Sequence, residues 1–404
     1  MSGYTDELTG VLREDRGLPG RYFTDDGILQ LEQVQLFERG WMCIGVSADA
    51  PHKGDLFPVS VLGVPLLMVR DDDTLRVFHN VCRHRGAILV EEATHGGPRV
   101  VCRYHGWGYR LNGELASTPH VGGPGTHGCE TVDCRSLGLR PVRSAEWAGH
   151  VFVNLSGTAP EFADWIRPSA TRFGAVPWGD LRCDRTLGRS LDVEANWKIV
   201  CENFVESYHL PTVHPELNSV NPMAAHYQIL GGHSYVGQGG SAYQGEVIAD
   251  GALPVMRGAS GYSSYESLLI VPNLILGPLP DMTFSIILLP LSAQRTAERL
   301  NFYFVGDEAL QPRYDEARTK SAGFIAKVNA EDVSIVESVQ HGRRSPAFDG
   351  GHFARGQETT SLHFQKMVAA ALLSNGQRSP QDVVELETRD INRQSRTGAA
   401  RSAT

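Results

Sequence analysis

The sequence lacks long hydrophobic runs, a surplus of basic residues and a glycine-rich turn between a strand and a helix. The most apolar stretches, 268–280 and 284–291, are short and interrupted by proline, so no membrane span is expected. With 37 Lys and Arg against 46 Asp and Glu, the net charge of −9 argues against a nucleic-acid-binding protein, which normally carries a basic surface. Without a glycine turn that cradles a dinucleotide, the chain is not expected to bind NAD(P)H itself.

The length and composition indicate an ordinary globular protein with two domains. Of 404 residues, 41% are hydrophobic and 21% are charged, which allows a sizeable core. No apolar run follows the first residues, so no secretory signal is expected. Two of the seven cysteines belong to the motif described next. The other five, an odd number, indicate reduced thiols and a cytoplasmic location.

The strongest motif is a pair of short segments that each offer one cysteine and one histidine. One residue separates Cys82 from His84, and two residues separate Cys102 from His105. This set suits a [2Fe–2S] cluster in which two thiolates hold one iron and two imidazoles hold the other. A structural zinc site is the alternative, but zinc modules usually pair cysteine with cysteine and histidine with histidine. We therefore expect a cluster.

Glycines follow both ligand pairs. Gly86 and Gly106 suit the close approach of backbone N–H groups to sulfur, because no Cβ stands in the way. With the run His-Gly-Trp-Gly-Tyr at 105–109 and Asn112-Gly113 behind it, the pattern resembles the Rieske family of [2Fe–2S] domains.

Both ligand pairs lie in a module of short strands, which we assign to residues 41–155 as an antiparallel β Rieske domain. The carboxylate triplet 71–73 is expected to form a solvated turn between two of the strands rather than a metal site. The expected strands include Leu56–Leu62, Pro65–Arg70, Leu75–Phe78 and His150–Leu155.

Residues 156–388 are expected to form a second, catalytic domain, entered through a connection at 157–180. Strands followed by helices without regular alternation indicate an α+β fold rather than a doubly wound sheet. The expected elements are a strand Arg189–Glu194, a helix Asn196–His209, several strands between Ser234 and Phe304, and helices Pro312–Val328 and Glu358–Leu373.

The two ends of the chain have different patterns. Residues 21–40 carry apolar side chains at helical spacing and are expected to form one helix that ends at Gly40. The whole helical segment 1–40 is expected to pack on the catalytic domain. From 389 to 404, arginines stand among small polar residues with no apolar period, so a disordered tail is expected there.

A second candidate metal site lies in the segment 196–217. His209 and His214 are five residues apart, so on a regular helix they would point about 140° away from each other. Pro211 prevents a regular helix, and a chain that bends after His209 can bring His214 back toward the same point. The spacing alone does not distinguish a metal site from two ordinary histidines.

The same segment resembles the mononuclear-iron motif of Rieske-type ring-hydroxylating oxygenases. The resemblance implies that His209, His214 and one downstream Asp bind Fe(II) as a facial triad with positions open to dioxygen. A helical segment near the C-terminus resembles the one that carries this third ligand, with Asp332 at the ligand position. Glu331 is the rival carboxylate, and Glu337 is a more distant one. The resemblance also implies a catalytic domain with an antiparallel sheet and flanking helices, of the helix-grip type.

Glu206 stands three residues before His209, so both can lie on one helical face. In the family, an acid at this place hydrogen-bonds a histidine of each centre and links the cluster of one subunit to the iron of its neighbour. The resemblance therefore implies a catalytic role for Glu206 and a ring of subunits, a homotrimer. Asn203, about one turn earlier, is either a group that supports the iron ligands or ordinary helix surface.

The resemblance covers nearly the whole chain, from about 21 to 373, and implies the terminal oxygenase of a Rieske non-haem iron system. Electrons from NAD(P)H would arrive through a separate reductase, of flavin or ferredoxin type, and one or both atoms of O2 would enter the substrate. The run from Glu206 to Leu217 looks most like the branch that hydroxylates quaternary amines such as glycine betaine and carnitine. When such an enzyme hydroxylates an N-methyl group, the product breaks its C–N bond and releases formaldehyde. Ser207 stands where this branch often has Cys.

Two other functions stay open at this point. One is hydroxylation of an aromatic acid or ring; the other, of a different class, is a Rieske electron-transfer protein without oxygenase activity.

Cys129 and Cys134 with His127 are either a small metal clip or ordinary loop residues. A quaternary amine would need an aromatic cage, for which the candidates are Tyr227, Tyr235, Tyr243, Tyr262, Tyr265 and Phe284.

Overall fold

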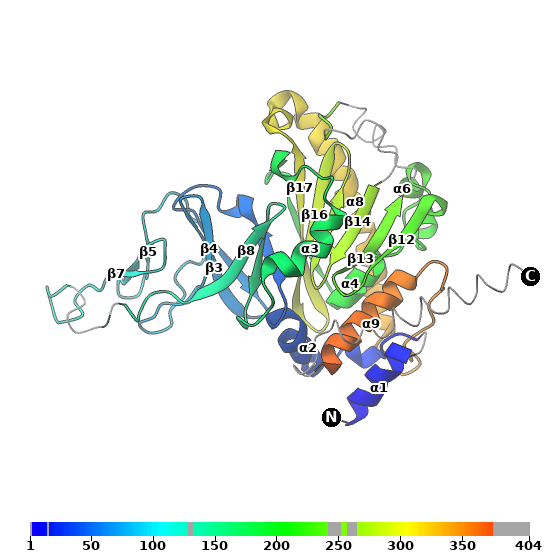
Figure 1. The fold of residues 1–404 in the computed structure, drawn as a ribbon, viewed down its shortest axis with the longest axis horizontal. Coiled ribbons are helices and arrows are strands. Elements are labelled where there is room, and N and C mark those ends of the chain that lie inside the picture. Colours follow the sequence, from blue (N-terminus) through cyan, green and yellow to red (C-terminus); the bar gives the residue numbers. More distant parts are fainter. Residues whose placement is uncertain are drawn as a thin grey trace, which may run out of the picture. The chain divides into compact units, whose positions relative to one another are not determined.

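The structure, a computed structural model, describes residues 2–13, 16–127, 133, 135–240, 252–256 and 265–374. The chain divides into two compact units (Figure 1). The first, here called the β unit, is Trp41–Ala159, and the second, the α+β unit, combines Met1–Gly40 with Pro160–Thr404. The parts of the sequence analysis that fall outside the described residues are the tail at 389–404, Cys129, Cys134, Tyr243 and Tyr262.

The β unit contains a larger and a smaller antiparallel sheet. The larger sheet has the strand order β1-β9-β8-β4-β3-β2, and the smaller has the order β5-β6-β7. The larger sheet consists of β1 Met42–Val46, β2 Leu56–Val61, β3 Val64–Asp71, β4 Thr74–His79, β8 Pro141–Trp147 and β9 His150–Asn154. The smaller sheet consists of β5 Val100–Val101, β6 Gly108–Tyr109 and β7 Leu115–Ser117.

Strands β2, β3 and β4 overlap the three strands predicted there from the sequence. The predicted turn at 71–73 is confirmed, because Asp71 pairs with Thr74 across it and Asp72 has a φ of 51°. Aspartate tolerates this left-handed conformation better than most residues, so the acidic triplet serves the turn.

The core of the β unit includes the base of both ligand loops. Apolar side chains of β3 and β4 pack together with residues of both loops in one buried cluster. Cys82 and Cys102 belong to this cluster and are 3% and 2% exposed. Because a close-packed core leaves little freedom, this burial fixes the two thiols in place.

One long antiparallel sheet forms the centre of the α+β unit. Its strand order is β10-β17-β16-β15-β14-β13-β12, and β11 also pairs with β17. Its strands are β10 Leu181–Cys183, β11 Arg189–Val193, β12 His226–Gly231, β13 Tyr235–Gly240, β14 Tyr265–Ile270, β15 Leu274–Pro278, β16 Met282–Ser292 and β17 Arg295–Val305. The predicted α+β class with an antiparallel sheet is confirmed.

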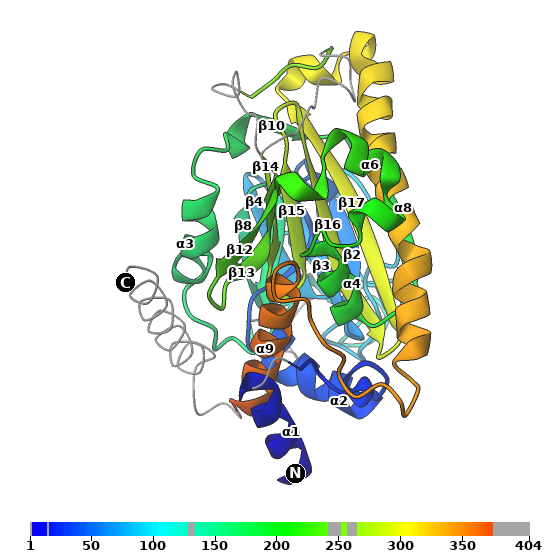
Figure 2. The ribbon, with the colours of Figure 1, turned by 90° about the vertical axis from the view of Figure 1, so that its right-hand side faces the viewer.

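Helices pack against this sheet and against one another (Figure 2). α9 contacts β12 and β13, α8 contacts β11 and β17, and α1 packs on α9. The helices are α1 Ser2–Arg13, α2 Asp26–Glu32, α3 Phe162–Arg172, α4 Trp197–Phe204, α5 Leu210–Val213, α6 Pro215–Val220, α8 Asp315–Gly342 and α9 Thr359–Leu373. Short 3-10 or π turns are η1 Gly20–Phe23, η2 Gln33–Glu38, η3 Ser47–Asp49, η4 Trp178–Asp180, η5 Met223–Ala225, η6 Asp307–Leu310 and η7 Pro312–Tyr314. Among the described residues, no helix is long and apolar enough to cross a bilayer.

The single helix predicted over 21–40 is wrong in detail. The segment consists of the turn η1, the helix α2 and the π turn η2. The break arises at Asp25, whose side chain accepts a hydrogen bond from Gly27 N at 2.7 Å and so caps a new helix start. Beyond the last turn, Gly40 N donates to Leu36 O at 3.2 Å, close to the predicted end.

Three further boundaries differ from the prediction. α4 ends at Phe204, earlier than predicted, with Val205 N donating to Cys201 O at 3.1 Å, and Pro211 lies in the first turn of the separate helix α5. α8 continues past Val328 to Gly342, since no proline or glycine interrupts the sequence between those two residues. The segment 157–180, predicted as a connection, contains the helix α3.

A buried ion pair holds the start of α4 against α2. Lys198 Nζ lies 2.7 Å from Glu32 Oε1, and both side chains are 0% exposed. Trp197 Nε1 donates to the other carboxylate oxygen at 2.8 Å. Removing one charge would leave the other buried and unpaired, at a cost of about 3–5 kcal/mol. The pair therefore fixes the helix from which the chain turns into the second candidate metal site.

Candidate functional site

The two ligand loops of the β unit share one backbone design. Gly86 N donates to Cys82 O at 3.0 Å, and Gly106 N donates to Cys102 O at 2.9 Å. In both loops the cysteine N–H donates to the carbonyl five positions later, at 2.8 Å. Gly86 and Gly106 have φ angles of 77° and 72°, which favour glycine. Glycine is thus required by the backbone conformation of the two turns and not, as the sequence suggested, by a close approach to sulfur, because a Cβ at Gly86 would meet no atom within 4 Å.

The histidines of the two loops lie side by side. The ring centroids of His84 and His105 are 4.7 Å apart, and the Trp107 ring stacks on His84 at 4.6 Å. Both histidines are exposed, whereas the cysteines of the same loops are buried. The Tyr109 hydroxyl lies 3.3 Å from Cys82 Sγ. The loops thus offer a buried thiol pair and an exposed imidazole pair.

These donors fit a [2Fe–2S] cluster. Although the His84 side chain is exposed, partial desolvation of its ring and the neighbouring His105 lower its pKa, which favours the neutral imidazole that ligates iron. Burial raises the pKa of the Cys82 thiol, and a coordinated iron would keep such a thiol deprotonated. The hydroxyl of Tyr109 can donate to the Cys82 sulfur, a hydrogen bond of the kind that adjusts a cluster's reduction potential.

In the α+β unit, His209, His214 and Asp332 meet at one point. Their ligand atoms all lie within 4.8 Å of one another. Asp332 Oδ1 lies 2.8 Å from His214 Nε2 and 3.6 Å from His209 Nε2. The two histidines flank the short helix α5, and Asp332 comes from α8. The bend expected after His209 is therefore supplied by α5 and the turns at its two ends.

A second carboxylate holds each histidine ring at its other nitrogen. Glu206 Oε1 lies 2.5 Å from His209 Nδ1, and Glu331 Oε2 lies 2.8 Å from His214 Nδ1. With Nδ1 as the donor, Nε2 of each ring directs a lone pair toward Asp332. Two imidazole nitrogens and one carboxylate with open sides are the donor set of a facial-triad iron site.

The charge of this site also fits a cation. Burial alone lowers the pKa of His214, but hydrogen bonds to Asp332 and Glu331 outweigh burial and raise that pKa above its ordinary value. The carboxylates of Glu206, Glu331 and Asp332 surround two imidazoles. A divalent metal ion balances this negative charge and takes the place of protons between the groups.

The structure separates the three acids considered as the third ligand. Asp332 faces Nε2 of both histidines, whereas Glu331 reaches Nδ1 of His214 and, with its other oxygen, lies 4.0 Å from Lys327 Nζ. Glu337 accepts a hydrogen bond from Glu194 N at 3.1 Å. Asp332 therefore completes the triad, and Glu331 orients one of its members.

Glu206 meets His209 through a turn, not along a helical face as the sequence suggested. Its Oε2 accepts from Tyr208 N and, at 3.3 Å, from His209 N, while Oε1 holds the His209 ring. The carboxylate thus fixes the backbone and the imidazole together. The neighbouring Tyr208 side chain is 53% exposed.

A cavity of about 120 Å³ adjoins the triad and is here called the triad cavity. Asn203 lines it, which favours a supporting role over ordinary helix surface. Ile325, Val328 and Asn329 of α8 also line it, and they precede Asp332 at helical spacing. That periodicity could have identified them from the sequence.

Three polar side chains of the sheet, His226, Gln238 and Tyr265, also face the triad cavity, and sequence reasoning missed His226 and Gln238. His226 Nδ1 lies 2.9 Å from Gln238 Oε1, and His226 Nε2 lies 3.4 Å from the Tyr265 hydroxyl. Asn221 Nδ2 donates to the same hydroxyl. Burial raises the pKa of Tyr265 to about 12 and lowers the pKa of His226, so both are neutral at pH 7.

The aromatic cage candidates separate into two groups. Tyr265 and Phe284 line the triad cavity, but Tyr235 and Tyr227 do not. Tyr227 instead donates its hydroxyl to Glu266 at 3.0 Å. The phenyl and phenol rings that line the triad cavity are Phe204, Tyr265, Phe284 and Phe324.

Comparison with known families assigns both units. Residues 40–133 match the Rieske [2Fe-2S] domain, and residues 181–374 match the ring hydroxylating alpha subunit (catalytic domain). The chain is a Rieske non-haem iron oxygenase alpha subunit. Its centres are a [2Fe–2S] cluster in the Rieske domain and a mononuclear iron at His209, His214 and Asp332. The zinc alternative and the electron-transfer protein without oxygenase activity are therefore wrong.

Curated relatives of the oxygenase are named for quaternary amines. It is 34% identical over 222 residues to the glycine betaine monooxygenase oxygenase subunit of Chromohalobacter salexigens, a match that covers 54% of this chain and 48% of that protein. It is 26% identical over 341 residues to the carnitine monooxygenase oxygenase subunit of Escherichia coli K12, covering 82% and 86% of the two chains. The match thus spans about half the length of the first relative and most of the second.

Solved structures share the fold of the oxygenase. The quaternary ammonium Rieske monooxygenase CntA in complex with gamma-butyrobetaine has a TM-score of 0.72 at 22% identity, covering 91% of this chain and 98% of that one. Naphthalene 1,2-dioxygenase from Rhodococcus sp., bound to indole, has a TM-score of 0.73 at 18% identity, covering 92% and 98%. Because enzymes named for such different compounds fit equally well, the fold does not identify the substrate.

Proposed function

We propose that the oxygenase hydroxylates a carbon next to nitrogen in a small quaternary amine of the betaine or carnitine type. One atom of O2 enters a C–H bond and the other leaves as water, which consumes two electrons and two protons. When the carbon is an N-methyl group, the hydroxylated product releases formaldehyde, so the net reaction is N-demethylation.

The observation that carries this proposal is the composition of the triad cavity. Aromatic rings, among them Tyr265 and Phe284, border a cavity whose floor carries the Asp332 carboxylate. A quaternary ammonium group is attracted both by aromatic faces and by nearby negative charge. The names of the glycine betaine and carnitine relatives support the same substrate class.

The protein's own residues hold and shape this site. Bound iron supplies dioxygen activation, and the cluster supplies electrons. Glu206 and Glu331 keep the protons of His209 and His214 on Nδ1, so both Nε2 atoms stay available for the metal. Apolar side chains of α8 and the sheet, among them Ile325, Val328 and Ile286, line the triad cavity and offer contact surface to the N-alkyl groups of the substrate.

We further propose that Glu206 lies on the electron path between chains. It holds His209 within its own chain, next to the exposed Tyr208, while His84 and His105 are exposed beside the cluster thiols. A carboxylate can accept hydrogen bonds from both sides, so Glu206 can link His209 to a cluster histidine of a neighbouring copy. A head-to-tail contact of this kind must close by rotation, and a homotrimer is the assembly we propose. Electrons reach the cluster from NAD(P)H through a separate reductase.

A single-turnover assay tests the substrate class without a partner protein. The purified oxygenase is reduced chemically, freed of reductant and mixed with dioxygen and one compound at a time, either a quaternary amine or an aromatic acid. The cluster's visible absorption reports its reoxidation. Rapid reoxidation with formaldehyde release for the quaternary amines alone is expected. Rapid reoxidation with a hydroxylated product for the aromatic acids alone would reject the proposal in favour of aromatic hydroxylation. An iron count on each sample excludes loss of metal as a cause of slow turnover.

A further inference from the structure

The helix α4 ends just before Glu206, and three consecutive backbone carbonyls lie at this end. Among the described residues, no backbone N–H donates to the carbonyl of Phe204, Val205 or Glu206. The last carbonyls of a helix lack partners within the helix, and Val205 is fully buried. Buried carbonyls of this kind need side-chain donors.

Two side chains from different elements supply these donors. The Nε2 amide group of Gln238, on β13, donates to Phe204 O at 2.9 Å and to Glu206 O at 3.1 Å. The hydroxyl of Thr360, on α9, donates to the carbonyl between them, Val205 O, at 2.7 Å. The three carbonyls are thus held from the sheet and from α9 at once, an arrangement here called the carbonyl clamp.

His226 fixes the orientation of the Gln238 amide. Because Nε2 of Gln238 donates to two carbonyls, Oε1 points to the other side, where it lies 2.9 Å from His226 Nδ1. An amide oxygen only accepts hydrogen bonds, so His226 Nδ1 is the donor. Both residues line the triad cavity, so the carbonyl clamp is part of the cavity wall.

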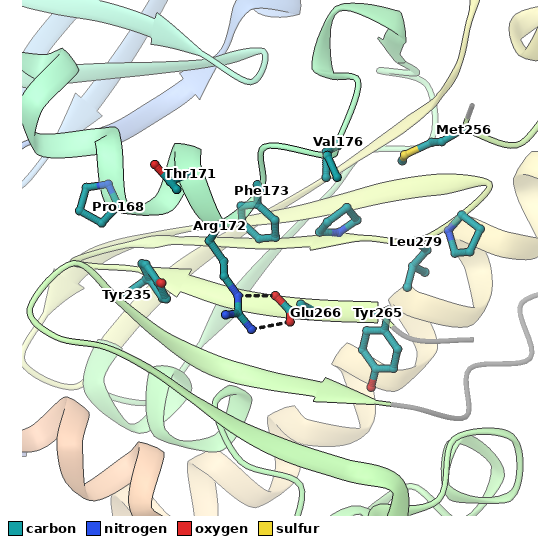
Figure 3. Close-up of a pocket in the computed structure, with 13 residues that line it drawn as sticks. Pro168, Thr171, Arg172, Phe173, Val176, Tyr235, Met256, Tyr265, Glu266 and Leu279 are labelled. Carbon is teal, nitrogen blue, oxygen red and sulfur yellow. Dashed lines mark hydrogen bonds and ion pairs between the residues drawn. The ribbon is translucent and has the colours of Figure 1, made fainter. Parts of the chain in front are cut away.

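The carbonyl clamp belongs to one face of the sheet. Gln238 pairs with Ser267 of β14, which also lines the triad cavity. Consecutive side chains of a strand point to opposite faces, so Glu266 points to the other face. There it binds Arg172 of α3 beside a separate cavity of about 660 Å³ (Figure 3). Gln238 therefore acts on the side of the sheet where the triad lies.

The carbonyl clamp fixes the backbone from which the Glu206 side chain extends. The carboxylate of Glu206 lies 2.5 Å from His209 Nδ1 with one oxygen and accepts from Tyr208 N with the other. Any shift of the backbone at Glu206 moves this carboxylate relative to the His209 ring. Misplacement of a supporting group by about 1 Å can cost about 100-fold in the rate of a reaction.

We propose that Gln238 and Thr360 are positioning residues for Glu206. They hold its carboxylate against His209 before iron binds, so that iron binding does not have to order this turn. The inference rests on the proposed function in one respect, because the electron path through Glu206 depends on the same placement. Ordering the backbone of one residue corresponds to about 5- to 30-fold in an equilibrium constant, so loss of the carbonyl clamp should weaken iron binding by that factor.

A pair of substitutions at Thr360 separates the hydroxyl from the volume of the side chain. Thr360→Val keeps the shape but cannot donate to Val205 O, whereas Thr360→Ser keeps the donor. The dissociation constant for Fe(II) is measured by equilibrium titration of the iron-depleted protein with its cluster retained. It should rise by about 5- to 30-fold in Thr360→Val and stay within about twofold of the wild type in Thr360→Ser. Gln238→Met, which removes two hydrogen bonds, should raise it at least as much as Thr360→Val.

The matched controls remove the same groups at the other end of α4. Thr296, fully buried like Thr360, donates its hydroxyl to Ala195 O at 2.7 Å. Gln340, also fully buried, accepts from Asn196 N at 2.9 Å. Thr296→Val and Gln340→Met should therefore lower the unfolding temperature, with the dissociation constant for Fe(II) within about twofold of the wild type.

Two results would overturn the proposal. One is a dissociation constant for Fe(II) that stays at the wild-type value in both Thr360→Val and Gln238→Met. The other is an equal rise in the two controls, which would mean that any loss of stability in α4 weakens the iron site.

The failure of the proposed electron path looks different. In iron-loaded Gln238→Met, reoxidation of the cluster should slow as it does in Glu206→Ala, but by a smaller factor. If Glu206→Ala itself reoxidises at the wild-type rate, the electron path through Glu206 fails. The iron titration needs neither substrate nor reductase, so it decides the role of Gln238 and Thr360 in that case as well.

Discussion

Asp332 and Glu331, adjacent in the sequence, bind opposite edges of the same imidazole. Glu331 Oε2 lies 2.8 Å from Nδ1 of His214, and Asp332 Oδ1 lies 2.8 Å from Nε2. The two acids therefore have different tasks although they stand side by side on α8. One faces the point where both histidines of the triad converge, and the other fixes the tautomer that leaves Nε2 free for the metal.

This division of tasks predicts different losses of iron. Asp332→Ala removes a ligand and should abolish mononuclear iron binding, with the cluster retained. Glu331→Ala leaves all three ligands but frees the ring of His214, so the dissociation constant for iron should rise by about 10–100-fold. Equilibrium titration of the iron-depleted variants with Fe(II) measures both effects. A full iron site in Asp332→Ala, with loss in Glu331→Ala, would make Glu331 the ligand.

Glu206→Ala is expected to separate electron transfer from metal binding. The variant should keep its cluster and, when loaded with excess Fe(II), its mononuclear iron, because the three ligands remain. The link proposed between His209 and the cluster of a neighbouring chain is lost in this variant. Reoxidation of the reduced cluster in the presence of dioxygen and substrate should therefore slow by about 100-fold, the largest effect usual for residues that support metal ligands. Stopped-flow absorption of the cluster provides the rate.

The matched control for this variant is Glu331→Ala loaded with iron in the same way. It loses a carboxylate from the other histidine of the triad, but not from the proposed electron path. Reoxidation at nearly the wild-type rate is expected there. Normal coupled turnover in Glu206→Ala, or equal slowing in both variants, would place the electron path elsewhere.

Asp55 makes the stability of the β unit depend on pH. Its buried carboxylate lies 3.1 Å from His95 Nδ1 and accepts from His52 N and Gly96 N, which ties together the chain on both sides of β2. Burial alone raises the pKa of Asp55, but these hydrogen bonds outweigh burial and lower it from 3.8. A group with a lowered folded-state pKa contributes stability above its ordinary pKa and loses that contribution as pH falls through the folded-state value.

Asp55→Asn should therefore destabilise the β unit by about 1–3 kcal/mol at pH 7, the usual cost of unsatisfied buried partners. The difference from the wild type should shrink as pH falls below 3.8. Urea unfolding followed by circular dichroism at several pH values measures this difference. Asp72→Asn serves as the control, because Asp72 pairs with Lys53 at the surface and should show almost no effect. A difference in unfolding free energy between Asp55→Asn and the wild type that does not change with pH would contradict this role of the Asp55 carboxylate.

The sequence allowed the class and the metal-binding residues to be predicted, because both depend on local motifs. The Cys–His pairs and their glycines form turns that close within a few residues, as the hydrogen bonds of Gly86 and Gly106 demonstrate. His209 and His214 are likewise positioned by one short helix and the turns beside it. The hairpin turn at Asp72 is equally local.

What could not be predicted depends on contacts between distant segments. The pairing of His226, Gln238 and Tyr265 results from the register of β12, β13 and β14, which no local pattern specifies. Glu331 could be recognised as an acid near the iron. That it binds Nδ1 of His214 and not Nε2 depends on how α8 lies beside the turn at His214, which the sequence does not specify. The ion pair between Arg172 at the end of α3 and Glu266 on β14 could not be predicted, because it joins distant segments and α3 was itself predicted as a connection.

The metal content of the wild type and of His209→Ala tests the central claim most directly. A chain with one Rieske cluster and one mononuclear site holds three irons and two acid-labile sulfides. For His209→Ala we predict two irons, two sulfides, an unchanged visible spectrum of the cluster and no oxygenated product. Three irons with normal product in this variant would contradict the assignment of the mononuclear iron to His209, His214 and Asp332.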